Sequence, residues 1–194
     1  MCIEKNQPKR EVKITKFGIA MEVVSITFLL TNITYVIIAY FKLPDLIPLH
    51  FNLDGEAVTF GSKKFIFIFP GISLFEYILL TALCQCPHKF NYIVKITEDN
   101  ADTQYNLAQN FLRFLKCLAI ILFFGTAIFL VKLAEKTVKI HTVLLFGLGF
   151  AIIFVVSLIS YCWVSKKYAS EVRRRSSART SQNRLLEMSA NNAN

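Results

Sequence analysis

The chain has 194 residues, of which 54% are hydrophobic, with a mean hydropathy of +0.47 and a formal net charge of +9. A soluble domain of this size has about 45–50% apolar residues, and here the excess falls in long runs nearly free of charge. Because the positive charge lies beside these runs, membrane topology and anionic lipid headgroups explain it better than nucleic acid. The composition therefore predicts an integral membrane protein in contact with the lipid bilayer, and no nucleic-acid partner.

Four apolar runs predict four transmembrane helices. A span needs about 20 residues, and continuous runs favour helices over the alternating strands of a barrel. No cleavage site follows the first run, so we interpret it as a retained helix and not as a signal peptide. The fold class we expect is an all-α membrane protein, a four-helix transmembrane bundle with a short extended, hairpin-like outer loop. The spans are expected at about 23–41, 65–86, 112–132 and 140–164.

The charges give the membrane domain (23–165) an expected orientation. Sixteen of the 22 Lys and Arg residues lie in the basic N-terminal tail (1–22), in the loop over 87–113 together with the adjoining Lys116, and in the polar C-terminal tail (166–194). The positive-inside rule then places both termini in the cytoplasm of a plasma-membrane protein. The C-terminal tail is expected to be disordered or a frayed extension of the fourth helix.

The first outer loop (42–64) has the pattern of a strand hairpin. Apolar and polar residues alternate over 47–53, and Asp54-Gly55 is a turn signal. Residues 57–60 could form the returning strand, and Ser62 is a suitable N-cap for the second span. We therefore predict a short flap on the outer surface.

Polar residues of this loop are the first candidate site. His50 with nearby acids, among them Asp45, could bind a cation, but their spacing matches no metal-ligand pattern. The favoured interpretation is that His50 and Asn52 fix the shape of the loop by hydrogen bonding, and recognition of an external peptide or lipid is the alternative. The candidate binding residues are Asp45, His50, Asn52, Gly55 and Lys63.

Glu76 lies near the middle of the second span. Acidic residues at this depth usually face a bundle interior or a cavity. Glu76 is therefore either a proton or ligand site, or a protonated carboxyl bonded to a neighbour such as Asn32 or Tyr35. The preceding Pro70-Gly71 could open a kink there.

The loop that precedes the third span carries a helix-start signal. Thr97 is followed by acids, as at a helix N-terminus. The third helix is therefore expected to begin near Glu98 and to project about 24 Å from the membrane at 1.5 Å per residue. At the membrane boundary, Arg113 and Lys116 are expected to extend toward lipid headgroups.

Cys84, Cys86 and His88 bring two thiols and an imidazole close together at the end of the second span. They could bind a soft metal, but we favour two interfacial cysteines, open to acylation, and an exposed histidine. We expect no bound metal and no cofactor. No catalytic motif is present, and His50 is the only plausible general base, so we do not expect an enzyme.

Two stretches resemble a bacterial and archaeal family of membrane domains of unknown function. They are LPDxIPxHFNxxG over 43–55 with FGSK over 60–63, and NYxVKITExNA over 91–101. The chain departs from the family at Val58, Phe60 and Ile93, where an acid, a tryptophan and a proline are common. The second motif adds candidate residues of its own, namely Asn91, Lys95, Thr97, Glu98 and Asn100.

The same domain forms the N-terminal part of SdpI-type bacteriocin immunity proteins, and their six-helix layout is not seen here. The resemblance implies toxin resistance or envelope signalling, with a peptide toxin or a membrane protein as partner. Our leading hypothesis is thus a non-enzymatic membrane protein that recognises something through its outer loop. The alternative is a small transporter or channel component that uses Glu76.

Overall fold

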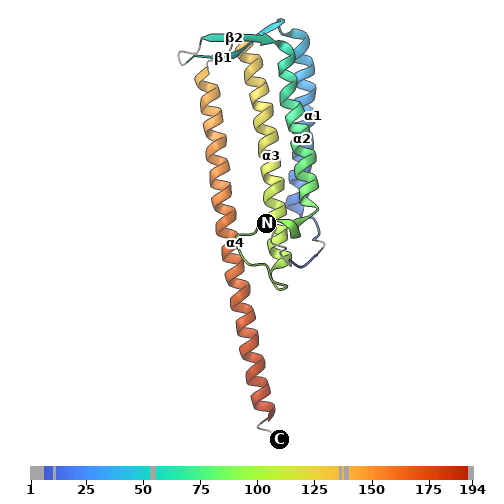
Figure 1. Cartoon of the computed structure of the whole chain (residues 1–194), viewed down its shortest axis with the longest axis vertical. Coiled ribbons are helices and arrows are strands. Elements are labelled where there is room, and N and C mark those ends of the chain that lie inside the picture. Colours follow the sequence, from blue (N-terminus) through green and yellow to red (C-terminus); the bar gives the residue numbers. More distant parts are fainter. Residues whose placement is uncertain (1–6, 11, 53–55, 136, 138–139, 192–194) are drawn as a thin grey trace, which may run out of the picture.

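A computed structural model of the chain describes residues 7–10, 12–52, 56–135, 137 and 140–191. In this part of the chain, four helices run side by side in alternating directions, and a two-stranded sheet closes one end (Figure 1). All four are long and apolar enough to cross a membrane, so the expected fold class is confirmed. The elements are α1 (Lys16–Lys42), β1 (Leu46–Phe51), β2 (Ala57–Ser62), the 3₁₀ turn η1 (Lys63–Phe67), α2 (Ile68–Cys84), the 3₁₀ turn η2 (Pro87–Lys89), α3 (Ala101–Ala134) and α4 (Ile140–Asn191).

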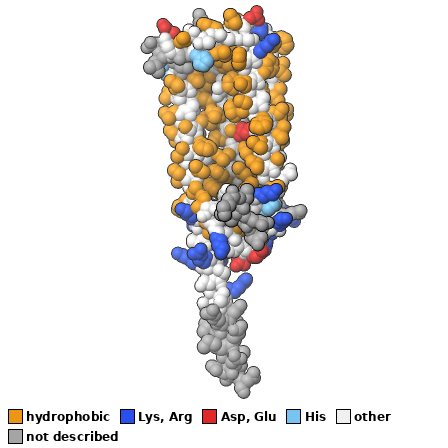
Figure 2. Space-filling view, viewed as in Figure 1, with side chains coloured by type: hydrophobic (Ala, Val, Ile, Leu, Met, Phe, Trp, Pro, Cys, Tyr) orange, Lys and Arg blue, Asp and Glu red, His pale blue; other side chains and the backbone are white. Residues whose placement is uncertain are grey.

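The two ends of the bundle differ in what they carry. The sheet lies at one end, here called the hairpin end. The loop between α2 and α3, the start of α1 and the last part of α4 lie at the other, here called the termini end. Between the two ends, hydrophobic side chains cover the visible face of the bundle as a broad band (Figure 2).

α1 begins earlier than the apolar run that predicted it. Thr15 is its N-cap and accepts a hydrogen bond from the backbone N–H of Gly18 at 3.0 Å, which satisfies a free donor of the first turn. Its buried residues recur mainly at intervals of three and four, and several are small or polar, as is usual where membrane helices approach closely. They are Gly18, Ser25, Leu29, Asn32, Val36 and Ala39.

α3 is the central helix and packs against α1, α2 and α4. It begins at Ala101, close to the start that the sequence predicted. The N-cap residue of α3 is Asn100 and not Thr97. The side-chain oxygen of Asn100 accepts a hydrogen bond from the backbone N–H of Thr97 at 2.8 Å. The predicted capping role of Thr97 was therefore wrong, because the chain forms a turn before the helix starts.

α2 shows no interruption at the Pro70-Gly71 pair, where the sequence had left a kink open. The helix starts at Ile68, so Pro70 lies in its first turn. Backbone N–H groups of a first turn have no helical acceptor, and a proline there therefore costs no hydrogen bond.

The hairpin is formed as the alternation predicted, with β1 antiparallel to β2. Ser62 caps η1 by accepting from the backbone N–H of Lys64 at 3.3 Å, as predicted. Ile47 is fully buried and joins the core cluster at the hairpin end, together with Val36, Ile66, Ala127 and others. The sheet is therefore seated in the bundle by the apolar side of β1.

The C-terminal tail is helical and not disordered. α4 continues without a break from the apolar stretch to Asn191. The extension runs well past the other helices at the termini end (Figure 1). Of the two outcomes that the sequence left open, the structure has the helical one, since neither glycine nor proline interrupts the chain there.

Candidate functional site

A charge cluster joins α1, α2 and α3 inside the apolar part of the bundle. Lys116 is fully buried, and its Nζ donates to both carboxylate oxygens of Glu22 at 2.7 Å and to the hydroxyl of Thr81 at 2.9 Å. The ammonium group also lies 4.3 Å from the ring centre of Tyr77, whose hydroxyl donates to Glu22 at 3.3 Å. Arg113 completes the cluster, with its Nε 3.4 Å from Glu22.

The cluster corrects our expectation that Arg113 and Lys116 extend to headgroups. Both side chains turn into the bundle, because a carboxylate on α1 lies opposite them. A buried charge is tolerated when it is paired and hydrogen-bonded. We had not considered Glu22 as a site residue, although two cations three residues apart on an apolar helix signal a need for a buried acid.

Of the two environments that the sequence left open for Glu76, a cavity and a hydrogen-bonded neighbour, the structure has the cavity. Its Oε2 atom is buried and has no hydrogen-bond partner in the described part of the chain. The predicted partner Asn32 instead donates to Ser73 at 3.3 Å. Glu76 lines a cavity of about 430 Å³, whose other lining residues are apolar and come from α2, α3 and α4. Asn32 is therefore bonded to Ser73 and not to the Glu76 carboxyl, and Glu76 faces an otherwise apolar cavity.

Asp45, Lys63 and Asn52 hold the hairpin in shape. The Nζ of Lys63 lies 3.1 Å from the Asp45 carboxylate, donates to the Leu43 carbonyl at 3.3 Å and lies 5.0 Å from the ring centre of Tyr40. Asn52 accepts from the backbone N–H of Glu56 at 2.7 Å and donates to its carboxylate at 3.1 Å. Gly55 lies outside the described residues.

His50 and β2 form the open surface of the hairpin. His50 is exposed and stands opposite Thr59 in the sheet. Five of the six residues of β2 are exposed, including Val58 at 64% and Phe60 at 57%. β2 pairs only with β1 in the described sheet, so its second edge has no strand partner.

The second motif forms an ordered loop at the termini end. Asn100 is 5% exposed, and its amide donates to the Lys95 carbonyl at 3.0 Å, while its oxygen holds Thr97. Glu98 points to the N-terminal segment, where Arg10 contacts it at 2.7 Å. The hydrogen bond that Arg10 donates to Glu98 raises the pKa of its guanidinium, and Asp102 adds to this. Asn91 also belongs to this loop and is exposed.

Tyr92 supports the same loop from within. Its hydroxyl donates to the Pro87 carbonyl at 2.9 Å, and its ring lies against Tyr105 with 5.6 Å between ring centres. Burial raises the pKa of the Tyr92 hydroxyl above its ordinary value. The hydroxyl therefore stays protonated as a donor to a higher pH than that of an ordinary tyrosine.

The two thiols and the imidazole at the end of α2 do not converge. Cys84 is buried, and its carbonyl accepts from the amide of Gln109 at 2.8 Å. Cys86 is half-buried at the turn before η2, which carries His88. Among the described residues, no three metal-ligating side chains lie close enough together to hold a metal ion.

Comparison with known proteins finds a family match for one stretch in the first half of this chain. Residues 26–74 match the sequence model of a family described as a domain of unknown function (DUF1648). The match runs from α1 through the hairpin into α2. None of the curated proteins and none of the solved structures matches the chain.

Proposed function

We propose that this chain is a non-enzymatic plasma-membrane protein that confers immunity to a peptide toxin by recognising it at the hairpin end. The observation that carries this proposal is the exposure of β2. Val58 and Phe60 are large apolar side chains held in the open on a sheet that Ile47 and Lys63 anchor rigidly. Aromatic side chains in such positions are common anchors of peptide recognition.

The free edge of β2 gives the surface a second means of binding. An extended peptide can add to an unpaired strand edge through backbone hydrogen bonds, while side-chain contacts supply specificity. The matched family segment includes the whole hairpin. The resemblance to SdpI-type immunity proteins supports a toxin peptide as the ligand.

The proposal also requires an orientation with the hairpin outside and both termini in the cytoplasm. The distribution of Lys and Arg supports it, since residues 1–22, 87–113 and 166–194 carry fifteen of 22. Cysteine introduced at exposed Thr59 should react with a membrane-impermeant maleimide in intact cells. Cysteine at exposed Ser177 should react only after permeabilisation, and the reverse pattern would refute this orientation.

The functional test uses cells from which the gene is deleted, challenged with a panel of peptide toxins from related bacteria. The intact chain should restore survival, and Phe60→Ala should raise sensitivity to the toxin about tenfold, the effect of losing one strong anchor. Phe41→Ala is the matched control, since Phe41 is 79% exposed but lies on α1. Unchanged sensitivity of the deletion strain across the panel would refute immunity, and full protection by Phe60→Ala would refute the hairpin as the binding surface.

One observation favours a second function, a small transporter or channel component. The Glu76 carboxyl has a buried oxygen without a partner beside a cavity, as expected of a group that exchanges protons or holds a substrate. Glu76→Gln and Glu76→Leu should both leave folding intact, and both should abolish flux in reconstituted vesicles. If Glu76→Leu transports normally, this function is excluded.

A further inference from the structure

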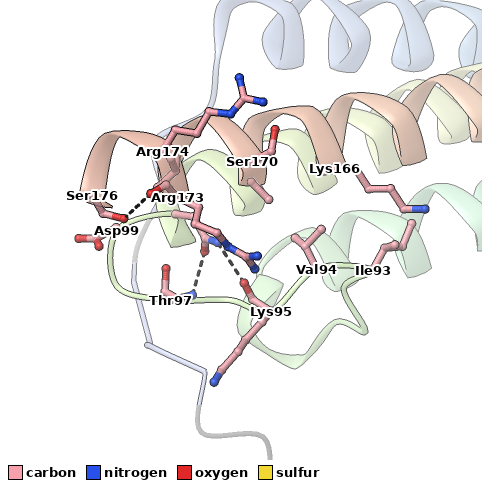
Figure 3. A pocket seen from close by; sticks show the side chains of 13 residues that line it. Ile93, Val94, Lys95, Thr97, Asp99, Lys166, Ser170, Arg173, Arg174 and Ser176 are labelled. Carbon is pink, nitrogen blue, oxygen red and sulfur yellow. Dashed lines mark hydrogen bonds between the residues drawn. The ribbon is translucent and has the colours of Figure 1, made fainter. Parts of the chain in front are cut away.

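A cavity of about 600 Å³ lies at the termini end, between the loop that precedes α3 and the extension of α4 (Figure 3). This volume falls in the usual range of ligand sites, about 300–1,000 Å³. The loop contributes the second sequence motif, and α4 contributes residues from about three turns of its basic segment. The lining residues used below are Ile93, Lys95, Asp99, Lys166, Arg173 and Arg174.

The cavity carries an excess of positive charge that the described chain does not neutralise. Four cations line it, and Asp99 is the only acid among the lining residues. In the described chain, none of these four cations forms an ion pair. The neighbouring acids Glu98 and Asp102 are both paired with Arg10, at 2.7 and 3.0 Å, and neither of them lines the cavity.

The walls of the cavity are held in place by buried polar contacts. Asn100 fixes the loop by bonding to both Lys95 and Thr97. Gln104 and Ser165, both fully buried, exchange two hydrogen bonds of 3.1 and 2.8 Å and fasten α4 to α3 at the level where the cavity begins. The loop and α4, each held by these hydrogen bonds, therefore form a preformed frame that carries the positive charges.

Figure 3 shows how the charged side chains lie around this frame. Arg173 reaches from α4 across the cavity toward the backbone of the loop. Arg174 and Lys95 point outward, and Lys166 lies at the opposite end beside Ile93. The guanidinium that enters the cavity is thus that of Arg173.

We propose that this cavity binds a phosphate group, presented by an anionic lipid headgroup or by a soluble phosphate compound. A guanidinium pairs with phosphate through two parallel hydrogen bonds. The hydroxyl of Thr97 lines the same cavity and can donate to a further phosphate oxygen, whereas that of Ser170 already donates to the Lys167 carbonyl at 2.7 Å. A phosphate offers more acceptor oxygens to the guanidinium and this hydroxyl together than a carboxylate does.

The two possible ligands, a lipid headgroup and a soluble phosphate compound, would enter the cavity from different ends. Lys166 follows Trp163, whose exposed ring is typical of the membrane interface. Arg173 lies seven residues further along α4, about 10 Å at 1.5 Å per residue. A lipid headgroup would therefore enter beside Lys166 and the apolar Ile93, and a soluble phosphate beside Arg173.

The experiment compares two arginine variants of the full-length chain in detergent. Arg173→Gln removes the cation in the cavity, and Arg175→Gln makes the same charge change at an exposed position that does not line it. Binding of phosphatidylglycerol and of phosphatidylcholine is measured by native mass spectrometry, and binding of inorganic phosphate by calorimetry. Lys166→Gln and Lys167→Gln form a second pair, so the test does not depend on one variant.

The proposal expects binding of phosphatidylglycerol or inorganic phosphate to weaken about tenfold in Arg173→Gln, as for loss of one charge-assisted contact. Arg175→Gln should change it less than about twofold, since distant exposed charges are screened. Binding of phosphatidylglycerol that inorganic phosphate does not displace identifies a lipid headgroup, and displacement identifies a soluble phosphate. Equal losses in the two arginine variants, or no preference for phosphatidylglycerol together with no phosphate binding, would overturn the proposal.

Discussion

All four helices are apolar enough to cross a membrane, but the first three are packed into the bundle more deeply than α4 is. In α1 and α3, 28% of the most apolar stretch is buried, and in α4 none of it is. The first three helices share the charge cluster of Glu22 and Lys116 and the contact of Asn32 with Ser73. α4 exposes a long series of large aliphatic side chains, among them Leu144, Leu148 and Val155.

This difference shows that hydrophobicity and association are separate properties of a membrane helix. Lipid tails are as apolar as leucine, so apolar side chains gain little by leaving lipid for another helix. The contacts of α4 to α3 are therefore few and specific. Phe111 stacks on Tyr161 with 4.4 Å between ring centres, Gln104 bonds with Ser165, and Phe146 lies over Gly125.

The largest effect should come from breaking the charge cluster. Lys116→Met leaves the half-buried Glu22 carboxylate with Arg113 as its one cation in the described chain, beside the Tyr77 hydroxyl. We expect it to lower the free energy of unfolding by about 3–5 kcal/mol, as for other broken buried pairs. The measurement is unfolding by SDS in mixed micelles. Lys132→Met, an exposed lysine on the same helix, should cost less than about 1 kcal/mol. Similar losses in the two variants would show that the cluster does not stabilise the bundle.

The contact between α3 and α4 can be tested at two glycines. A Cβ at Gly125 would clash with the ring of Phe146, whereas one at Gly147 would meet nothing within 4 Å. Gly125→Ala should destabilise the chain by about 1–3 kcal/mol through overpacking, and Gly147→Ala should be neutral or stabilising by up to about 1 kcal/mol. Thermal unfolding in detergent checks both. If Gly125→Ala proves harmless, α4 is not seated against α3 at this point.

The smallest effect is expected from removing the hydrogen bond between Asn32 of α1 and Ser73 of α2. Asn32→Leu removes one hydrogen bond to Ser73, and such bonds between membrane helices average about 0.6 kcal/mol, with a maximum near 1.7. The same SDS titration measures it, and Thr31→Leu is the control, because Thr31 is exposed and bonds only to its own helix. A loss above about 3 kcal/mol would mean that Asn32 belongs to a larger network than the one described.

Much of the fold could be predicted because its signals are local. The apolar runs gave the four spans, and the alternation around His50 gave the strands, since both patterns depend on neighbours in sequence. The capping role of Ser62 was also predictable from its position before a helical stretch. The kink that the sequence had left open at Pro70 is absent from the structure. The cost of a proline depends on its distance from the start of the helix, and the apolar run did not locate the start of α2.

The sequence by itself determined that this chain has four helices long and apolar enough to cross a membrane, and that a hairpin separates the first two. Only the tertiary structure decided which polar groups meet. Lys116 finds Glu22 across 94 residues of sequence, and Arg173 enters the cavity beside the loop of Asn100. The physical reason is that such pairings depend on the rotation and depth of each helix in the bundle, which many weak contacts set together and no single segment encodes.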